Sequence, residues 1–130
     1  MDSAAPGRSV LVADDEPRLL RLLERVLERA GYPVVTARDG EQAIRAIDAH
    51  PREIAVAVLD GAMPPEGAGP VLEAIARCNG RVGVILTSGE ALEGSLRERL
   101  RAQRGIFLHK PFPPRELLRA VQASLTSEAP

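Results

Sequence analysis

The chain of 130 residues alternates between short apolar runs and longer segments with a helical spacing of apolar residues. The short runs are rich in valine, isoleucine and leucine, and they occupy residues 9–13, 33–37, 54–59, 82–87 and 105–109. Three of them are almost wholly apolar, which is typical of strands that are covered on both faces. The alternation therefore predicts buried strands separated by helices.

The segments between these runs have the apolar periodicity of amphipathic helices. The first of them, residues 17–31, has one wide apolar stripe made of Leu19, Leu22, Leu23, Val26, Leu27 and Ala30. Pro17 suits the first turn of this helix, and Gly31 suits its end. Further helices are predicted over 39–50, where Asp39 would be the cap, and over 69–80, 91–105 and 113–125. The segment 91–105 has only Leu92, Leu96 and Leu100 as its apolar edge.

The resulting order, βαβαβαβαβα, predicts an α/β fold with a parallel sheet and helices on both of its faces. We expect a single domain over residues 1–130, with a core at about 8–125 and loose ends. Ligands of such open sheets bind outside the carboxyl ends of the strands. Functional residues are therefore expected directly after each strand.

Composition excludes several classes of function. The net charge of −1 gives no electrostatic reason for binding nucleic acid or an anionic membrane. The single cysteine, Cys78, excludes an internal disulfide framework. No apolar run approaches the roughly 20 residues that span a bilayer, and the first residues lack the pattern of a signal peptide. We expect a cytoplasmic protein without a DNA-binding output domain on this chain.

Polar groups follow four of the five predicted strands. They are Asp14, Asp15 and Glu16 after the first, Asp60 after the third, Thr87 and Ser88 at the end of the fourth, and Lys110 after the fifth. Lys110 is the one lysine beside sixteen arginines. An ammonium is a compact point charge, whereas a guanidinium is a planar fork, so this position is a candidate for needing an ammonium.

These groups suggest a shared site. Clustered carboxylates repel one another unless a cation neutralises them, and an oxygen-only cluster favours Mg²⁺ with phosphate oxygens completing its shell. A lysine and a hydroxyl suit the remaining phosphoryl oxygens, which indicates phosphoryl transfer. Simpler interpretations stay open for each group: helix caps for the first acidic residues, a turn at Asp60, and a chain reversal at Lys110. Their position at one edge of one sheet favours the shared site.

Three stretches, VLVADDEP, VLDGAMP and FLHKPF, resemble in order and spacing the receiver domains of two-component response regulators. The resemblance covers about residues 8–125. It implies a doubly wound, five-stranded, flavodoxin-like (βα)5 fold with the strand order 2-1-3-4-5. It also implies a cis bond between Lys110 and Pro111, an uncommon isomer that would aim the lysine.

The resemblance also implies a role for each residue of the site. Asp60 would be the nucleophile that accepts a phosphoryl group. Asp15 would bind Mg²⁺ directly and Asp14 through water, with Asp60 and the backbone carbonyl of Ala62 as further ligands. Lys110 would pair with Asp60 at rest and with a phosphoryl oxygen afterwards.

The switch residues follow from the same resemblance. Phe107, three residues before Lys110, matches the aromatic residue that turns inward when a hydroxyl binds the phosphoryl group. The usual spacing between that hydroxyl and the lysine of the family favours Ser88, with Thr87 as the alternative. The two cannot both face the site, because neighbouring residues on a strand face opposite ways. Glu90 lies where the family tunes the lifetime of the phosphoryl group.

A histidine kinase or histidine phosphotransfer protein is the implied phosphodonor, with an unknown downstream effector. The chain would not be an enzyme beyond promoting phosphorylation and dephosphorylation of its own aspartate. A receiver-like scaffold that binds partners without phosphorylation is the alternative. A magnesium-dependent phosphohydrolase is disfavoured because ADDEP lacks the Asp-x-Asp spacing after the first strand, and a flavin site is disfavoured because the phosphate loop is missing.

Overall fold

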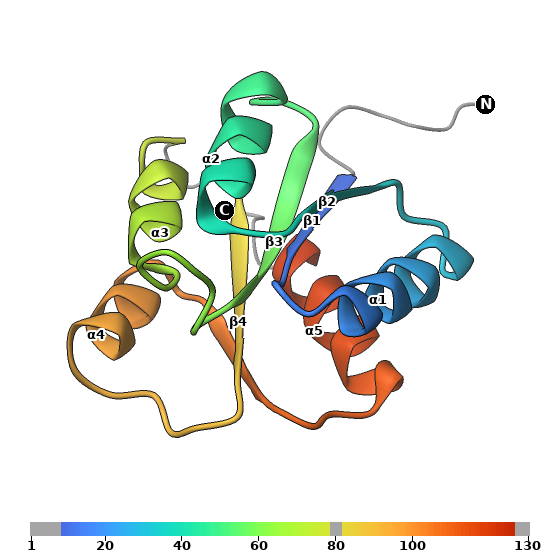
Figure 1. The fold of residues 1–130 in the computed structure, drawn as a ribbon. Helices are drawn as coiled ribbons and strands as arrows, with labels where there is room; N and C mark the ends of the chain where they lie inside the picture. Colours follow the sequence, from blue (N-terminus) through green and yellow to red (C-terminus); the bar gives the residue numbers. More distant parts are fainter. Residues whose placement is uncertain (1–8, 79–81, 127–130) are drawn as a thin grey trace.

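The computed structural model describes residues 9–78 and 82–126 (Figure 1). Its strands are β1 (Ser9–Ala13), β2 (Val34–Ala37), β3 (Ile54–Asp60), β4 (Gly83–Ser88) and β5 (Ile106–His109). Its helices are α1 (Pro17–Arg29), α2 (Gly40–Ala49), α3 (Gly69–Ala76), α4 (Gly94–Ala102) and α5 (Pro114–Thr126). Strands and helices alternate as the sequence predicts. The end of the predicted helix 69–80, at residues 79 and 80, lies outside the described residues.

The strands form one parallel sheet in the order β2-β1-β3-β4-β5, which confirms the predicted doubly wound, flavodoxin-like fold. Strand β3 lies at the centre of this order, and all seven of its residues are buried. The sequence of β3 is apolar up to Asp60 because a central parallel strand is covered on both faces. Asp60 is therefore the last residue, at the carboxyl end, of a fully buried central strand.

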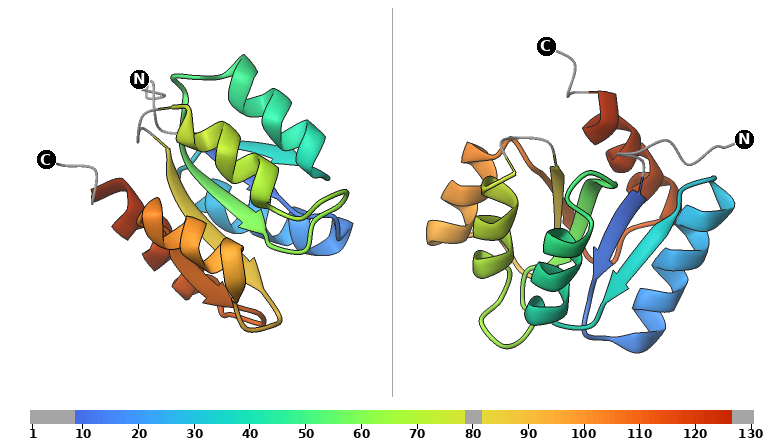
Figure 2. Two further views of the ribbon diagram at one scale, coloured as in Figure 1. Left: turned by 90° about the vertical axis from the view of Figure 1, so that its left-hand side faces the viewer. Right: turned by 90° about the horizontal axis from the view of Figure 1, so that it is seen from above.

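Helices cover both faces of the sheet, as the two views of Figure 2 show. Helices α1 and α5 pack on one face, through a core that includes Leu23, Leu27, Leu117 and Val121. Helices α2, α3 and α4 pack on the other, through a core that includes Ile47, Leu72, Ile75 and Leu100. No helix in the described part of the chain is long and apolar enough to cross a membrane.

The residues that helix α1 buries differ from the predicted apolar stripe. Leu20, which the stripe omits, is buried with Leu23 and Leu27. Leu22 is 51 % exposed, and Ala30 is exposed as well. A helix on a sheet buries only the arc that faces the sheet, and its shoulder stays open unless another element covers it. The predicted stripe was therefore too wide on one side.

Helix α4 is shorter than predicted and holds to the core weakly. It begins at Gly94, whose φ of 62° lies in the left-handed region, and it ends at Ala102. Leu100 is its buried residue, while Leu92 and Leu96 are only half-buried. Little apolar surface therefore fixes this helix on the sheet.

Candidate functional site

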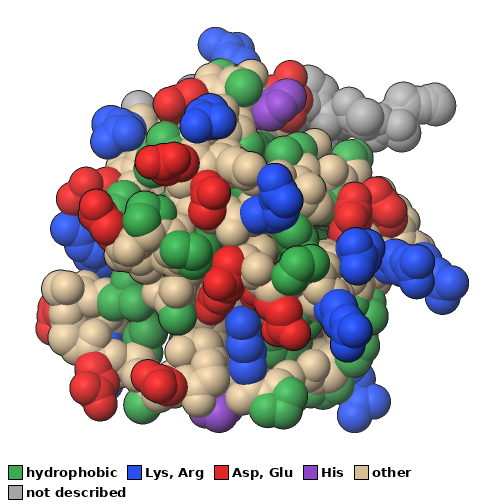
Figure 3. All heavy atoms as spheres, in the orientation of Figure 1, with side chains coloured by type: hydrophobic (Ala, Val, Ile, Leu, Met, Phe, Trp, Pro, Cys, Tyr) green, Lys and Arg blue, Asp and Glu red, His purple; other side chains and the backbone are tan. Residues whose placement is uncertain are grey.

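The carboxyl ends of β1, β3 and β5 bring the predicted acidic and basic residues together. Asp14 and Asp15 directly follow β1, Asp60 is the last residue of β3, and Lys110 follows β5. Carboxylate oxygens of the three aspartates lie within 4.8 Å of one another. Figure 3 shows acidic side chains gathered beside a basic one near the middle of this face. The edge of the sheet thus carries one compact cluster.

Lys110 lies between two of the carboxylates. Its Nζ is 3.1 Å from Oδ2 of Asp14 and 3.4 Å from Oδ1 of Asp60. Both aspartates are buried, with exposed fractions of 2 % and 7 %. The bond between Lys110 and Pro111 is cis, as the resemblance implies. The shorter contact with Asp14 is a feature that the sequence did not indicate.

Two main-chain amides fix the orientation of the buried carboxylates. The amide of Glu16 donates to Oδ1 of Asp14 at 2.9 Å, and the amide of Ala62 donates to Oδ1 of Asp60 at 3.3 Å. Each bond spans two residues, so each aspartate is held by the backbone that immediately follows it. The oxygens are thereby placed before any ligand arrives.

The simpler interpretation of the acidic residues after β1 as helix caps does not fit the structure. The cap position of α1 is Glu16, and its side chain forms no capping hydrogen bond. By contrast, Asp39 after β2 accepts from the amide of Gln42 at 2.8 Å, which is an ordinary cap and confirms that prediction. Asp14 instead contacts Lys110 across the sheet edge.

The site carries an excess of negative charge. Burial raises the pKa of Asp60, the charge of Asp14 raises it further, and the hydrogen bond from Ala62 opposes the rise. Burial alone would lower the pKa of Lys110, but the hydrogen bond and charge of Asp14, together with Asp60, raise it overall. The cluster holds three carboxylates, and the one ammonium beside it contacts Asp14 and Asp60. An all-oxygen donor set with this charge fits a hard divalent cation.

The two hydroxyls at the end of β4 face opposite sides of the sheet. Thr87 is in register with Asp60 on β3 and with Leu108 on β5. Because Leu108 packs in the core under α1 and α5, Thr87 faces that layer. Its exposed fraction is 2 %, and its hydroxyl donates to the carbonyl of Leu59 at 3.4 Å.

Ser88 lies on the other face, together with Phe107. Phe107 is in register with Leu86, two residues before Ser88, and both pack against the core under α2, α3 and α4. Ser88 is half-buried, and its hydroxyl accepts from the amide of Glu90 at 3.0 Å. A Cβ added to Gly61 would lie 3.8 Å from Cβ of Ser88. Ser88 therefore stands beside the residue that follows Asp60.

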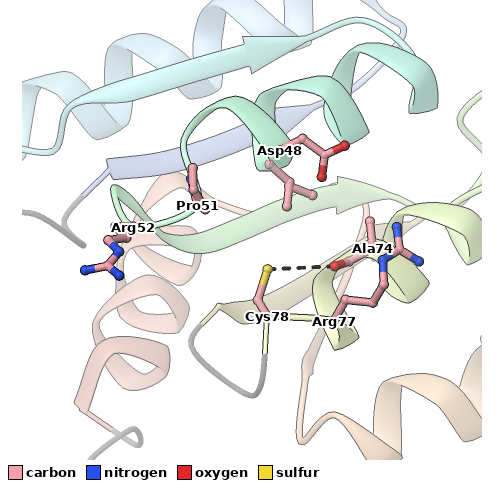
Figure 4. Close-up of a pocket in the computed structure, with 7 residues that line it drawn as sticks. Asp48, Pro51, Arg52, Ala74, Arg77 and Cys78 are labelled. Atoms are coloured by element: carbon pink, nitrogen blue, oxygen red, sulfur yellow. Dashed lines mark hydrogen bonds between the residues drawn. The ribbon is translucent and has the colours of Figure 1, made fainter.

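A separate hollow of about 370 Å³ lies between the ends of α2 and α3 (Figure 4). It sits near the amino end of β3, at the opposite edge of the sheet from Asp60. The thiol of Cys78 donates to the carbonyl of Ala74 at 3.7 Å, and the guanidinium groups of Arg52 and Arg77 point away from each other. The hollow has no part in the acidic cluster.

Fold and site together define a doubly wound α/β protein with an acidic, lysine-bearing site at its strand ends. The chain belongs to the response regulator receiver domain family of two-component signalling, whose model matches residues 10–122. It is 32 % identical over 119 residues to the response regulator GtcR of Aneurinibacillus migulanus, covering 92 % of this chain and 48 % of that one. It is 35 % identical over 126 residues to the transcriptional regulatory protein PrrA of Mycobacterium tuberculosis, covering 96 % and 53 %. The chain thus spans about half the length of these relatives.

Solved structures share the fold. A CheY-like receiver domain from Methanospirillum hungatei superposes with a TM-score of 0.82 at 21 % identity, covering 93 % of this chain and 95 % of that one. The CheX–CheY–BeF3–Mg²⁺ complex from Borrelia burgdorferi contains a chain with a TM-score of 0.78 at 26 % identity, covering 88 % and 87 %. That complex contains Mg²⁺, and the acidic cluster of this chain offers the donors that such an ion takes.

Proposed function

We propose that this chain, residues 1–130, is a phosphoacceptor receiver domain that works in the cytoplasm. A histidine kinase or histidine phosphotransfer protein would donate a phosphoryl group to Asp60 in a magnesium-dependent reaction, and the domain would then change conformation. The observation that carries the proposal is the cluster of three aspartates within 4.8 Å, with the Lys110 ammonium in contact with two of them. Carboxylates this close repel one another, so the cluster favours a bound cation.

The reaction follows from the chemistry of these side chains. A carboxylate oxygen of Asp60 attacks phosphorus and forms an acyl phosphate, while the bond from phosphorus to the donor nitrogen breaks. The electron pair of that bond returns to the donor histidine. The ammonium of Lys110, which contacts the Asp60 carboxylate at rest, then pairs with a phosphoryl oxygen. The backbone amide of Ala62, which donates to Oδ1 of Asp60, would help to orient the carboxylate for the attack.

Asp14, Asp15, Asp60 and the carbonyl of Ala62 would hold the magnesium ion, Asp15 directly and Asp14 through water. The ion would neutralise the crowded carboxylates and the incoming phosphoryl oxygens. Because Asp14 also contacts Lys110, its carboxylate would serve both the ion and the ammonium. The contact with Asp14 would also keep the ammonium of Lys110 beside the phosphoryl oxygens that it neutralises.

Ser88 is the hydroxyl that we propose as the phosphoryl sensor, and Phe107 is the residue that responds to it. Both lie on the face of the sheet that α4 covers, whereas Thr87 faces the other layer and bonds to the backbone. A shift of Ser88 toward the phosphoryl group would open space into which Phe107 can turn, as a shift between two populated arrangements. Glu90, exposed beside Ser88, would affect how long the phosphoryl group survives.

Incubation with a small acyl phosphate and Mg²⁺ tests the proposal. Intact-mass spectrometry should show the addition of one phosphoryl group, and hydroxylamine should remove it. Asp60→Asn should abolish the addition, whereas Asp39→Asn, which changes the cap of α2, should leave it intact. Removal of divalent ions should also prevent it. Uptake by Asp60→Asn at the wild-type rate would show that the acceptor lies elsewhere.

Replacement of the lysine tests the role of its charge. Lys110→Arg keeps a positive charge but replaces a point charge with a planar fork, so the variant should signal poorly. The readout is the difference between phosphorylated and unphosphorylated protein in the ring signals of Phe107 by NMR. A wild-type response in Lys110→Arg would argue against the proposed role of the ammonium.

The alternative is a scaffold that binds its downstream effector without phosphorylation. The retained acceptor, acidic residues and lysine disfavour it, because a scaffold has no use for a crowded carboxylate cluster. Absence of any phosphoryl addition in the presence of Mg²⁺ would favour the scaffold instead.

A further inference from the structure

Gly61, the residue directly after Asp60, does not need to be glycine for its backbone conformation. Its φ lies outside the left-handed region, in which the described chain places Gly31, Gly67 and Gly94. This backbone would therefore accept any side chain. A glycine also loses more conformational freedom on folding than any other residue, so its presence here has a cost. The reason for a glycine lies in the space around it.

Two elements of the proposed switch border that space. A Cβ placed on Gly61 would lie 3.7 Å from Cδ2 of Leu96 in α4 and 3.8 Å from Cβ of Ser88. It would also lie 3.4 Å from the carbonyl oxygen of Thr87. One added carbon atom would thus make normal van der Waals contacts, whereas a branched side chain would press against Leu96 or Ser88.

The backbone of Gly61 is held from two sides. Its amide donates to the carbonyl of Thr87 at 2.8 Å, which ties it to β4. On the other side, the loop folds back at Gly67, whose φ is 75°, and a Cβ placed there would lie 3.0 Å from the carbonyl oxygen of Gly61. The amide of Gly67 donates to the carbonyl of Met63 at 2.6 Å and closes this loop. A side chain at position 61 would therefore displace its neighbours rather than the backbone.

Helix α4 is the neighbour that yields most easily. Leu100 is its buried residue. The helix lies beside α3 (Figure 1), and Arg99 forms an ion pair with Glu73 of α3 at 3.0 Å. Both of these side chains are exposed, so the pair holds the helix weakly. The contact of Leu96 with the backbone after Asp60 is therefore an important part of what positions α4.

We propose that Gly61 is a positioning residue of the switch: the missing side chain lets Leu96 rest on the backbone after the acceptor, and this contact sets the resting position of α4. The space over Gly61 is shared by Leu96 and Ser88. A movement of Ser88 toward a phosphoryl group would change the shape of this space, and Leu96 would follow. The proposal rests on the proposed function for the event that moves Ser88, but the contact itself is present in the unphosphorylated chain.

Hydrogen exchange of the unphosphorylated chain tests the contact. Exchange at the amides of α4 should be about tenfold faster in Gly61→Val than in wild type, because the added methyl groups press on Leu96. Gly61→Ala is the matched control and should stay within about twofold of wild type, since a single carbon atom fits. The amides of α1, on the other face of the sheet, should exchange at the wild-type rate in both variants.

A double variant tests whether Leu96 is the side chain that is displaced. In the background of Leu96→Ala, the change Gly61→Val should alter exchange in α4 by no more than about twofold, because the methyl groups then have room. If Gly61→Val alone does not fold, the double variant should fold. Its failure to fold would contradict the contact.

Reaction with a small acyl phosphate and Mg²⁺ tests the link to the switch. The difference that phosphorylation makes to the amide signals of α4 by NMR should be largely lost in Gly61→Val, where α4 is already displaced, and kept in Gly61→Ala. If wild type takes up no phosphoryl group, the proposed function fails, while hydrogen exchange still decides whether residue 61 positions α4.

Three outcomes would overturn the inference. An equal effect of Gly61→Val with and without Leu96→Ala would show that Leu96 does not rest on Gly61. Faster exchange in α1 as well as in α4 would show a general loss of stability. A wild-type response of α4 to phosphorylation in Gly61→Val would show that the contact plays no part in switching.

Discussion

The ends of the neighbouring strands β3 and β4 differ in how firmly the chain holds them. Asp60 ends a strand whose seven residues are all buried, and α3 packs behind it through four buried residues. Ser88 ends a strand that leads into α4, where Leu100 is the buried residue. The region of β3 and α3 is therefore held by many buried residues, whereas α4 after β4 is held by few.

This difference separates two requirements of a phosphorylation switch. The acceptor must be held in place, because misplacing a reacting group is costly. The responding element must change position at a small cost in free energy, so it has to be drawn from the less stable part of the fold. In the proposed switch, the apolar sequence of β3 would meet the first requirement and the sparse leucines of α4 the second.

Truncation of one leucine in the helix that follows each strand tests this comparison. Leu72→Ala in α3 should lower the free energy of unfolding by about 2–5 kcal/mol, because its side chain is fully buried. Leu96→Ala in α4 should cost clearly less, about 1 kcal/mol, because the residue is only half-buried. Chemical denaturation monitored by circular dichroism measures both. Equal losses would mean that α4 is as firmly packed as α3.

Asp60→Asn should stabilise the fold in metal-free buffer. The raised pKa of Asp60 means that its protonated form is favoured in the folded state. Its contribution to stability is therefore present below the unfolded value of 3.8 and is lost as the pH rises through the higher folded value. The free energy of unfolding of Asp60→Asn should exceed that of wild type most at neutral pH. This difference should shrink as the pH falls toward 3.8.

The control for this prediction is Asp39→Asn, because Asp39 is also an aspartate that follows a strand, but it only caps α2. Asparagine is also a good cap, so this change should leave stability almost unaltered at every pH. Magnesium should narrow the difference in stability between Asp60→Asn and wild type, since a cation relieves the same repulsion between carboxylates. If Asp60→Asn is less stable than wild type at neutral pH, the inference that the crowded carboxylates destabilise the folded state is wrong.

The smallest effects on stability are expected at the end of β4. Thr87→Ala removes a buried hydroxyl that donates to Leu59 and should cost about 1 kcal/mol. Ser88→Ala should cost about 0.5 kcal/mol or less, yet it should suppress the phosphorylation-dependent change at Phe107. Denaturation and NMR of the phosphorylated proteins measure the two readouts. Loss of the switch in Thr87→Ala instead would reverse the assignment.

Sequence predicted the order of elements and the residues at the strand ends, because both depend on patterns along the chain. Five apolar runs identify the strands, and the carboxyl ends of parallel strands must meet at one edge. The exposure of Leu22 was missed, because apolar spacing shows which side of a helix is apolar but not how much of it a sheet covers. The contact between Lys110 and Asp14 was missed for a similar reason, since it depends on side-chain placement between distant strands.

The amide of Lys110 donates to the carbonyl of Ser88 at 2.8 Å. This one residue thus joins the two halves of the proposed switch: its ammonium meets the acceptor, and its backbone is tied to the sensor. A change at the acceptor could therefore reach the sensor through one residue and one hydrogen bond. The rate of switching would then depend on how readily α4, which has one buried leucine, changes position.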